Sequence, residues 1–455
     1  MSRLVAISNR VSLPRRGTVP GGLAVGLLAA MRARGGLWFG WSGEISDAPG
    51  PAETIRRDGL SFATIDFSQE EFQEYYLGFC NDVLWPLFHY FVDNFSYSEA
   101  QYERYLAVNQ RFARELLPLL KPDDVLWVHD FHLLPLAQML REAGVTQKTG
   151  LFLHIPFPHV ELLRVLPVYG ELMRSLLEYD LVGFQTEGDL ASFRSVVEML
   201  WGPESTAEPG MITVGSRRVR TGVYPIGVDV AQIQDAAARA LTGEPCRRMV
   251  AGLLGRKLMI GVDRLDYSKG LVERFRAYER FLETHPDNIN RVTFLQIAPI
   301  SRADVLAYAA IRNELEQASG RTNGRFADTD WTPIRYLNRN FPHDVLMGFM
   351  RAAPVGIVTP VRDGMNLVAK EFVAAQDPDD PGVLILSTLA GAARELAAAV
   401  QVNPYDLRGI AHAIQQAFNM PLAERRERHQ AMMEVLTRND IHAWHTRFLE
   451  ALNAC

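Results

Sequence analysis

Two cations stand close together in RLDYSKG, residues 264–270, directly after the apolar, strand-like run KLMIGVD. Arg264 offers a planar fork of donors and Lys269 a compact point charge, a combination that suits the oxygen atoms of a diphosphate. An ordinary solvated loop with an ion pair to Asp266 would fit the same residues. The position at a strand end favours the ligand, so we expect a phosphate-binding loop here.

A second segment in the same half of the chain has the features of an anion site. TPVRDGMNLVAKEF, residues 359–372, runs from a strand through Gly364 into a helix. Backbone N–H groups at a helix start can hold phosphate oxygens. Asp363 precedes this helix and Glu371 lies within it. A carboxylate on a helix is usually solvated, but the glycine-containing entry and the nearby cation loop favour a ligand-binding role.

Polar residues also follow two strand-like runs of the first half. WVHDFHLLP, residues 127–135, places Asp130 after one run, and HIPFP, residues 154–158, places His154 after the next. Histidines near an aspartate suggest a metal, but the helical spacing of zinc ligands is missing. Hydrogen bonding at the strand ends is the alternative. Two consecutive strand ends with such residues favour a functional site.

Further candidates in this half are weaker individually. Arg10 follows the first strand-like run, Trp41 follows WFG, and Tyr76 and Trp85 bracket a helical stretch. Tryptophans are usually core residues, and the adjacent tyrosines 75 and 76 could simply pack.

Two glycines and one arginine complete the set of candidates. PGGLAVG, residues 20–26, contains Gly21 and Gly22 and leads into a helix, so it is either a phosphate or sugar cradle or a structural turn. Its spacing departs from the dinucleotide fingerprint. Arg302 follows another strand-like run and fits the same wall as Arg264.

The elements that must position these residues alternate between apolar strands and amphipathic helices, which is typical of α/β folds with covered parallel sheets. Strands are expected at 3–8, 125–129, 151–155, 180–185, 257–263, 292–298, 354–359 and 382–387, and helices at 102–120, 160–177, 187–200, 270–283 and 302–319. The stretch 421–454 is expected to be helical throughout, with caps at Asn439 and Asp440. GVYPIGVD, residues 222–229, marks the boundary between two halves. Open parallel sheets bind ligands at their strand carboxyl ends, so a cleft shared by both halves is expected.

Composition narrows the class of protein. The 455 residues are 48% hydrophobic and 22% charged, with a net charge of −6, which argues against a nucleic-acid-binding protein. No apolar run is long enough to span a membrane. The three cysteines are widely spaced and show no zinc pattern, so we expect reduced thiols and a cytoplasmic location.

The chain as a whole resembles the trehalose-6-phosphate synthases, retaining GT-B glycosyltransferases of glycosyltransferase family 20. The motifs that carry the resemblance cover essentially the whole chain in order: SNR at 8–10, GGLAVG at 21–26, GLWFGWSGE at 36–44, VHDFHLLPLA at 128–137, HIPFP, GFQTE at 183–187, YPIGVD at 224–229, RLDYSKG, and RDGMNLVAKEFVAAQD at 362–377. They correspond to one synthase unit, so no phosphatase half is expected.

The resemblance implies an α/β fold of two Rossmann-like parallel-sheet domains that face a central cleft. It implies an acceptor domain at 1–225, a donor domain at 226–438, and a C-terminal helix at 439–455 that packs back toward the first domain. It also implies transfer of glucose from a nucleotide-diphosphate glucose, usually UDP-glucose, to glucose 6-phosphate, giving α,α-trehalose 6-phosphate. No cofactor or metal is implied, and relatives often self-associate, so a homo-oligomer (dimer or tetramer) is compatible with it.

Residue roles follow from the matching positions. The positions that match the acceptor site are Arg10, Trp41, Tyr76, Trp85, Asp130 and Arg302. Those that match the donor site are Gly21, Gly22, His154, Arg264, Lys269, Asp363, Gly364, Met365, Asn366, Leu367, Val368 and Glu371. The resemblance gives the catalytic roles to Arg264, Lys269, Asp130 and His154.

Three alternatives stay open at this point. A phosphorylase shares the architecture and could hold pyridoxal phosphate on Lys370. A pseudo-glycosyltransferase could couple an unusual cyclitol, and a non-catalytic protein could sense sugar phosphates. The sequence also leaves open the base of the donor, the oligomeric state, and same-face attack against double displacement.

Overall fold

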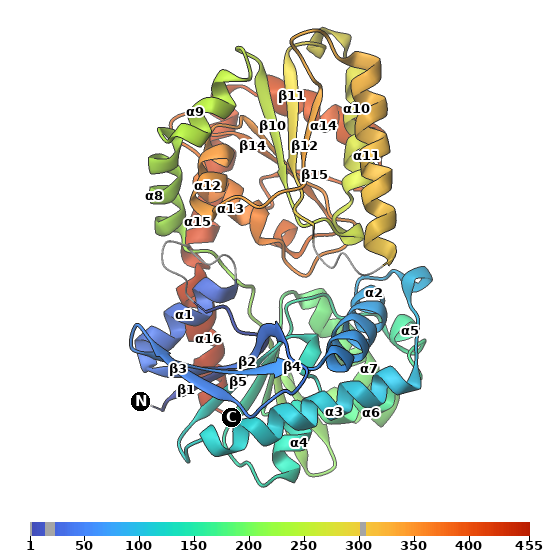
Figure 1. Ribbon diagram of the computed structural model, residues 1–455, viewed down its shortest axis with the longest axis vertical. Coiled ribbons are helices and arrows are strands. Elements are labelled where there is room, and N and C mark those ends of the chain that lie inside the picture. Colours follow the sequence, from blue (N-terminus) through green and yellow to red (C-terminus); the bar gives the residue numbers. More distant parts are fainter. Residues whose placement is uncertain (1, 14–22, 301–305) are drawn as a thin grey trace. The chain divides into compact units, whose positions relative to one another are not determined.

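The computed structural model describes residues 2–13, 23–300 and 306–455, which form two compact units (Figure 1). Unit 1 contains the described residues up to Pro225 together with His442–Cys455, and unit 2 contains the described residues of Ile226–Ile441. The chain therefore leaves unit 1 after Pro225 and returns to it at His442.

Unit 1 is built on a nine-stranded sheet in the order β3-β4-β2-β1-β5-β6-β7-β9-β8. The strands are β1 Leu4–Arg10, β2 Gly36–Ile45, β3 Glu53–Arg57, β4 Leu60–Phe67, β5 Val125–His129, β6 Thr149–Phe152, β7 Leu181–Phe184, β8 Met211–Val214 and β9 Arg217–Val223. The strands from β4 to β9 are parallel, while β3 and β8 pair antiparallel at the two edges. The central strands are buried along almost their whole length, as expected for a sheet covered on both faces.

The helices of unit 1 cover both faces of this sheet. They are α1 Leu23–Arg34, a π-helix at Glu71–Leu84, α2 Trp85–Phe88, α3 Glu99–Leu116, α4 Leu136–Glu142, α5 Val160–Leu163, α6 Tyr169–Leu176, α7 Glu187–Trp201 and α16 Ile441–Asn453. In Figure 1, α3, α4 and α6 lie next to one another on one side of the sheet. The C-terminal helix α16 packs Trp444 and Phe448 against Trp127 of β5, with ring centroids 4.9 Å apart in both cases.

Unit 2 is built on a six-stranded parallel sheet in the order β12-β11-β10-β13-β14-β15. The strands are β10 Lys257–Val262, β11 Val292–Ile297, β12 Ile334–Leu337, β13 Val355–Val358, β14 Val383–Ser387 and β15 Val400–Val402. Numbered along the chain within the unit, this order reads 3-2-1-4-5-6, the strand order of the Rossmann fold.

Helices cover both faces of the unit 2 sheet. They are α8 Val230–Leu241, α9 Glu244–Ala251, α10 Leu271–Thr284, α11 Leu306–Phe326, α12 His343–Arg351, α13 Leu367–Ala375, α14 Leu407–Asn419 and α15 Leu422–Arg438. In Figure 1, α10 and α11 lie on one side of this sheet, while α8, α12 and α13 lie on the other. Buried Leu271, Phe275, Tyr278 and Leu282 recur every three or four residues in α10, which gives the helix one apolar face toward the sheet.

The structure confirms two Rossmann-like parallel-sheet units and adds strands that the sequence did not predict. These are β2, β4, β9, β12 and β15 and the two antiparallel edge strands. Two expected helices are divided: 160–177 into α5 and α6, and 421–454 into α15 and α16, with the break at Asn439–Asp440.

Each sheet has one topological switch point, where the strand order reverses direction. In unit 1 the loops after β1 and β5 diverge there, and in unit 2 the loops after β10 and β13. Ligands of open α/β sheets bind at this place, outside the strand carboxyl ends.

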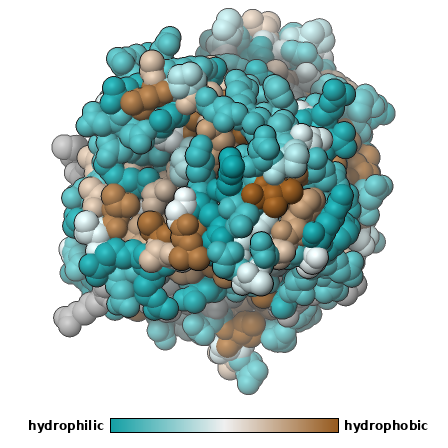
Figure 2. All heavy atoms as spheres, turned by 90° about the horizontal axis from the view of Figure 1, so that it is seen from above, coloured by the Kyte–Doolittle hydropathy of each residue, from teal (hydrophilic) through white to brown (hydrophobic). Residues whose placement is uncertain are grey.

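The surface is mostly hydrophilic on the face drawn in Figure 2, where apolar residues form separate small patches. Within the described part of the chain, no helix is long and apolar enough to cross a membrane.

Candidate active site

In unit 2, the loops after β10 and β13 are joined by an ion pair at the switch point. The Lys269 ammonium donates to Asp363 Oδ2 at 2.6 Å, and both side chains are almost fully buried. Asn366 Nδ2 donates to the same carboxylate oxygen at 3.0 Å. Lys269 has three N–H donors and uses one here, so it can still bind an anionic oxygen.

The loop that carries the two cations is held rigidly by its own residues. Asp266 is fully buried and accepts hydrogen bonds from Ser268 N and Oγ, at 3.0 and 2.9 Å, and from Tyr308 Oη at 3.1 Å. Ser268 O accepts from Val361 N at 2.9 Å, which ties this loop to the loop after β13. Arg264 lies 3.7 Å from Asp266 and its side chain is 47% exposed. The loop therefore contains the ion pair of the alternative interpretation, but it is packed rather than solvated.

Arg274 of α10 stabilises this loop by hydrogen bonds, although the sequence did not predict a role for it. Its guanidinium group is fully buried and donates to Asp263 at 2.6 Å, Gln296 at 2.9 Å, Thr359 at 3.0 Å and the carbonyl oxygen of Lys269 at 3.3 Å. These partners come from three adjacent strand ends and from the cation loop. Burial raises the pKa of Asp263, and the charge of Arg274 opposes that shift.

The segment Gly364–Val368 forms a tight entry into α13. Asn366 has φ +77° and caps the helix, accepting from Ala369 N at 3.2 Å. A side chain on Gly391 would lie 1.9 Å from Gly364 O, so this approach requires glycine. The first turn of the helix, which contains Leu367 and Val368, leaves N–H groups without intrahelical partners. Met365 is buried beside it.

Glu371, about one turn into α13, is not a solvated carboxylate. It is 9% exposed, and its Oε1 lies 3.1 Å from His343 Nε2 of α12. Burial opposes the charge on His343, but the Glu371 and Asp344 carboxylates prevail and raise its pKa. His343 was not predicted, because its place beside Glu371 depends on tertiary packing.

In unit 1, Arg10 ends β1 and Asp130 follows β5, so both lie at the switch point of that sheet. Asp130 has φ +75° and ψ 173°, a conformation that strains a residue with a side chain. Its N–H donates to Phe152 O at 2.8 Å, and its Oδ1 accepts from His154 N at 3.2 Å. The strand ends of β5 and β6 are thereby locked together with Asp130 and His154 side by side.

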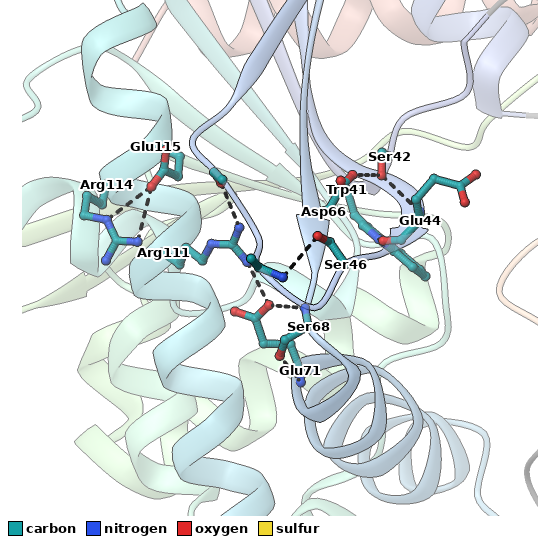
Figure 3. A network of polar contacts seen from close by, with 12 residues as sticks. Trp41, Ser42, Glu44, Ser46, Asp66, Ser68, Glu71, Arg111, Arg114 and Glu115 are labelled. Carbon is teal, nitrogen blue, oxygen red and sulfur yellow. Dashed lines mark hydrogen bonds and ion pairs between the residues drawn. The ribbon is translucent and has the colours of Figure 1, made fainter.

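Arg10 lies against the aromatic residue Trp41 of β2. Its guanidinium carbon is 5.7 Å from the Trp41 ring centroid. A side chain on Gly43 would lie 2.6 Å from Arg10 Nη2, so the glycine leaves room for this cation. Figure 3 shows the surroundings of Trp41, whose indole N–H donates to Glu44 O at 2.7 Å. The buried Trp41 ring is thus held at the rim of the sheet, and the exposed Arg10 lies against it.

Tyr76 joins this group from the π-helix. Its ring centroid is 5.4 Å from that of Trp41 and 6.1 Å from that of His132, on which it stacks. The neighbouring Tyr75 is fully buried and donates to Asn9 Oδ1 at 2.9 Å, so it is a core residue. Of the two adjacent tyrosines, only Tyr76 is available to a ligand.

Trp85 begins α2 at the end of the same π-helix. It is 5% exposed and stacks on His89 with ring centroids 4.0 Å apart. It also contacts Phe131, the residue after Asp130, at 5.9 Å. Through Phe131, Trp85 packs against the end of β5 next to Asp130.

His154 is paired with a second histidine that the sequence did not single out. His129 Nδ1, on the last residue of β5, lies 3.1 Å from His154 Nε2. Burial lowers the pKa of His154 to about 3. Burial, together with the neighbouring His154, also lowers the pKa of His129. Both rings are therefore neutral at physiological pH.

Three predicted residues, Gly21, Gly22 and Arg302, lie outside the described residues. In the part of the chain that is described, no group of three or more His, Cys, Asp and Glu side chains could hold a metal ion.

Comparisons with known proteins agree on one family. A sequence model described as Glycosyltransferase family 20 matches residues 15–454. A trehalose-6-phosphate synthase of Klebsiella pneumoniae subsp. pneumoniae is 49% identical over 460 residues, covering 99% of this chain and 95% of that protein.

Two solved structures are similar over nearly their whole length. One is a UDP-forming alpha,alpha-trehalose-phosphate synthase from Burkholderia xenovorans in complex with glucose-6-phosphate, with a TM-score of 0.95 and 48% identity over 99% of this chain and 100% of that chain. The other is an E. coli protein bound with UDP-2-fluoro glucose, with a TM-score of 0.95 and 46% identity over 99% of each chain.

Proposed function

Because the chain belongs to glycosyltransferase family 20, we propose that it transfers glucose with retention from a nucleotide-diphosphate glucose to glucose 6-phosphate. The products are α,α-trehalose 6-phosphate and the nucleoside diphosphate. UDP-glucose is the proposed donor, supported by the UDP-forming relatives and by the UDP-sugar analogue in the E. coli structure.

One observation carries this proposal. The residues that match the family's binding motifs gather at the topological switch point of each sheet, which is where the fold binds ligands. Arg10 and Asp130 lie there in unit 1, and Lys269 and Asp363 in unit 2. The whole-length similarity to a structure that contains glucose-6-phosphate supports the assignment of the acceptor.

The acceptor roles fall mainly to unit 1. Arg10 and Tyr76 bind the 6-phosphate, Arg10 through the N–H donors of its guanidinium group and Tyr76 through its hydroxyl group. Asp130 accepts hydrogen bonds from sugar hydroxyl groups, and Trp41 and Trp85 shape the wall. Arg302 adds a third contact to the phosphate by its match to the family motif.

The donor roles fall mainly to unit 2. Arg264 and Lys269 bind the diphosphate, helped by the helix start at Gly364–Val368. Asp363 and His154 hold hydroxyl groups of the transferred glucose, and Glu371 holds the ribose. Gly21 and Gly22 complete the donor site by their match to the motif.

The chemistry follows from where charge develops. Breaking the anomeric C–O bond produces an oxocarbenium-like sugar and puts negative charge on the departing phosphate. The guanidinium of Arg264 and the ammonium of Lys269 stabilise that negative charge, so no metal ion is needed for this step. For retention we propose same-face attack, in which the leaving phosphate accepts the proton of the incoming hydroxyl group. Asp130 and Asp363 then position sugars and form no covalent intermediate.

The pyridoxal phosphate alternative is disfavoured by the surroundings of Lys370. Its ammonium is fully buried and bonds to Ile226 O at 2.7 Å and Glu395 Oε2 at 2.5 Å. Both contacts favour a protonated structural lysine over a Schiff-base nitrogen.

A donor panel tests the proposal. The purified protein is incubated with UDP-, GDP- or ADP-glucose, with and without glucose 6-phosphate, and release of the nucleoside diphosphate is followed. We expect release that depends on both substrates and is fastest with UDP-glucose. Absence of release with every donor would favour the sugar-phosphate sensor instead.

A further inference from the structure

In the proposed function, His154 of the pair His129–His154 contacts the transferred sugar. The contact between the two rings limits which of their nitrogen atoms can carry a proton. The two rings are joined through His129 Nδ1 and His154 Nε2 at 3.1 Å. Both rings are neutral, so each carries one N–H and one bare nitrogen. A hydrogen bond between them therefore requires that one ring donates and the other accepts.

Two arrangements satisfy this requirement. If His129 donates from Nδ1, then His154 Nε2 is bare and His154 carries its proton on Nδ1. If His154 donates from Nε2, then its Nδ1 is bare and can only accept. The direction of this one hydrogen bond thus decides whether His154 offers a substrate a donor or an acceptor.

The surroundings of His129 favour the first arrangement. His129 is 1% exposed, and its Nε2 has no hydrogen-bond partner among the described residues. Its ring centroid lies 4.6 Å from that of Trp127 and 6.3 Å from that of Trp444. Both indole N–H groups are buried and also lack an acceptor within the described chain. No acceptor for an Nε2–H of His129 is found among the described residues, whereas a proton on its Nδ1 is accepted by His154 Nε2, so the first arrangement leaves no buried N–H of His129 without a partner.

The same packing fixes the His154 ring in place. Phe152 meets it edge-on with centroids 4.7 Å apart, and Trp444 lies 6.0 Å away. Asp130 Oδ1 accepts from the His154 backbone N–H at 3.2 Å, which fixes the backbone of His154. Among the described residues, His129 is the hydrogen-bond partner that the structure gives to this ring.

We propose that His129 is a positioning residue that donates from Nδ1 to His154 Nε2 and holds His154 as the Nδ1–H tautomer. His154 then donates a hydrogen bond to a hydroxyl oxygen of the transferred glucose. This second statement rests on the proposed function, whereas the tautomer does not.

The first test is a spectrum of the substrate-free protein. Histidine is labelled with ¹⁵N, and the ring nitrogen shifts and two-bond proton couplings of His129 and His154 are assigned with single-histidine variants. We expect the Nδ1–H form for both rings. An Nε2–H form of His154 in the wild-type protein overturns the proposal, and this arm needs no turnover.

The second test compares two substitutions kinetically. His129→Asn keeps an N–H donor close to the Nδ1 position, while His129→Leu removes it. Loss of one hydrogen bond corresponds to about a fivefold to tenfold effect. We expect His129→Leu to lower kcat/KM for the nucleotide sugar by about that factor or more, with KM for glucose 6-phosphate within about twofold, and His129→Asn to recover most of the loss.

Equal losses in both variants, or a His129→Leu protein that matches the wild type, contradict the positioning role. If His129→Leu does not fold, the wild-type spectrum and His129→Asn decide the question. Wild-type turnover is measured first, so that failure of the proposed function is seen as absent turnover, separately from a wrong tautomer. His285→Leu, a substitution in unit 2 outside the site, serves as the control and should leave both readouts unchanged.

Discussion

Replacing Lys269 with methionine tests the leaving-group role most sharply within the chain. Methionine keeps most of the length and the apolar character of the lysine stem but removes the ammonium that lies 2.6 Å from Asp363 Oδ2. The loop keeps its other supports, since Asp266 and Arg274 bind its backbone and Ser268. We therefore expect a folded protein with a specific defect in turnover.

The magnitude has two parts. Loss of one fixed charge-stabilising donor in the transition state costs about 2.7–4 kcal/mol, or about 10²–10³ in kcat. In addition, the Asp363 carboxylate is 13% exposed and loses its counter-ion. The unpaired Asp363 carboxylate then repels the negative charge of the departing phosphate. For two unit charges about 8 Å apart at an effective dielectric constant of about 20, this repulsion is about 2 kcal/mol. The two parts sum to about 4.7–6 kcal/mol, so the expected fall in kcat is about 3 × 10³- to 3 × 10⁴-fold.

The assay follows nucleoside diphosphate release at saturating concentrations of both substrates. Lys257→Met is the matched control, because Lys257 begins β10, at the end of that strand opposite to the loop that contains Lys269, and bonds to Phe418 O. That variant should keep kcat within about twofold. The double variant Lys269→Met/Asp363→Asn should lose less than the product of the single losses, since the two side chains contact each other. A Lys269→Met protein with wild-type thermal stability and kcat within tenfold of wild type would refute the reasoning.

The remaining predictions concern both units. Arg264→Ala should lower kcat by about 10²–10³ without changing the unfolding temperature, because the side chain is 47% exposed; an active variant would mean that the diphosphate is held elsewhere. Arg10→Ala should raise KM for glucose 6-phosphate more than about tenfold and leave the donor KM nearly unchanged, since a charged hydrogen-bonding group is lost; equal rises would contradict the acceptor assignment. Gly43→Ala should act in the same direction, because its new methyl group would lie 2.6 Å from Arg10 Nη2 at φ +96°. For His154, burial lowers the pKa from 6.5 to about 3, so the unfolded chain binds more protons between these values. Its stabilising contribution is complete above pH 6.5 and is lost as the pH falls toward 3; the drop in urea midpoint from pH 7 to pH 5 should shrink in His154→Gln, and an unchanged drop would show that His154 is not buried neutral.

Much of the fold could be predicted because parallel strands buried on both faces are continuous apolar runs. β10 and β11 stand out in this way, and so do the helices that follow them. β2 did not, because its segment GLWFGWSGEI mixes glycines with aromatic residues and ends in polar ones. The edge strands β3 and β8 are short, β3 is exposed along its whole length and β8 is partly exposed, so they lack the apolar signal.

The site was predictable where a side chain directly follows a strand, as Asp130 does. Residues that reach the site through tertiary packing left no such signal. Arg274 has the place of a surface cation on an amphipathic helix, yet it is fully buried and bonds to Asp263, eleven positions away in sequence. His343 reaches Glu371 from another helix, and His129 is one of several polar residues in its motif. Sequence distance gives no means of pairing such residues.

The most direct test of the proposed reaction is the stereochemistry and composition of its product. The wild-type protein is incubated with α-configured UDP-glucose and glucose 6-phosphate, and the product is examined by ¹H and ³¹P nuclear magnetic resonance. We predict a phosphorylated disaccharide with both anomeric centres α, formed in equal amount to the nucleoside diphosphate released. A β-linked product, free glucose, or nucleotide release without the disaccharide would contradict retaining transfer to glucose 6-phosphate.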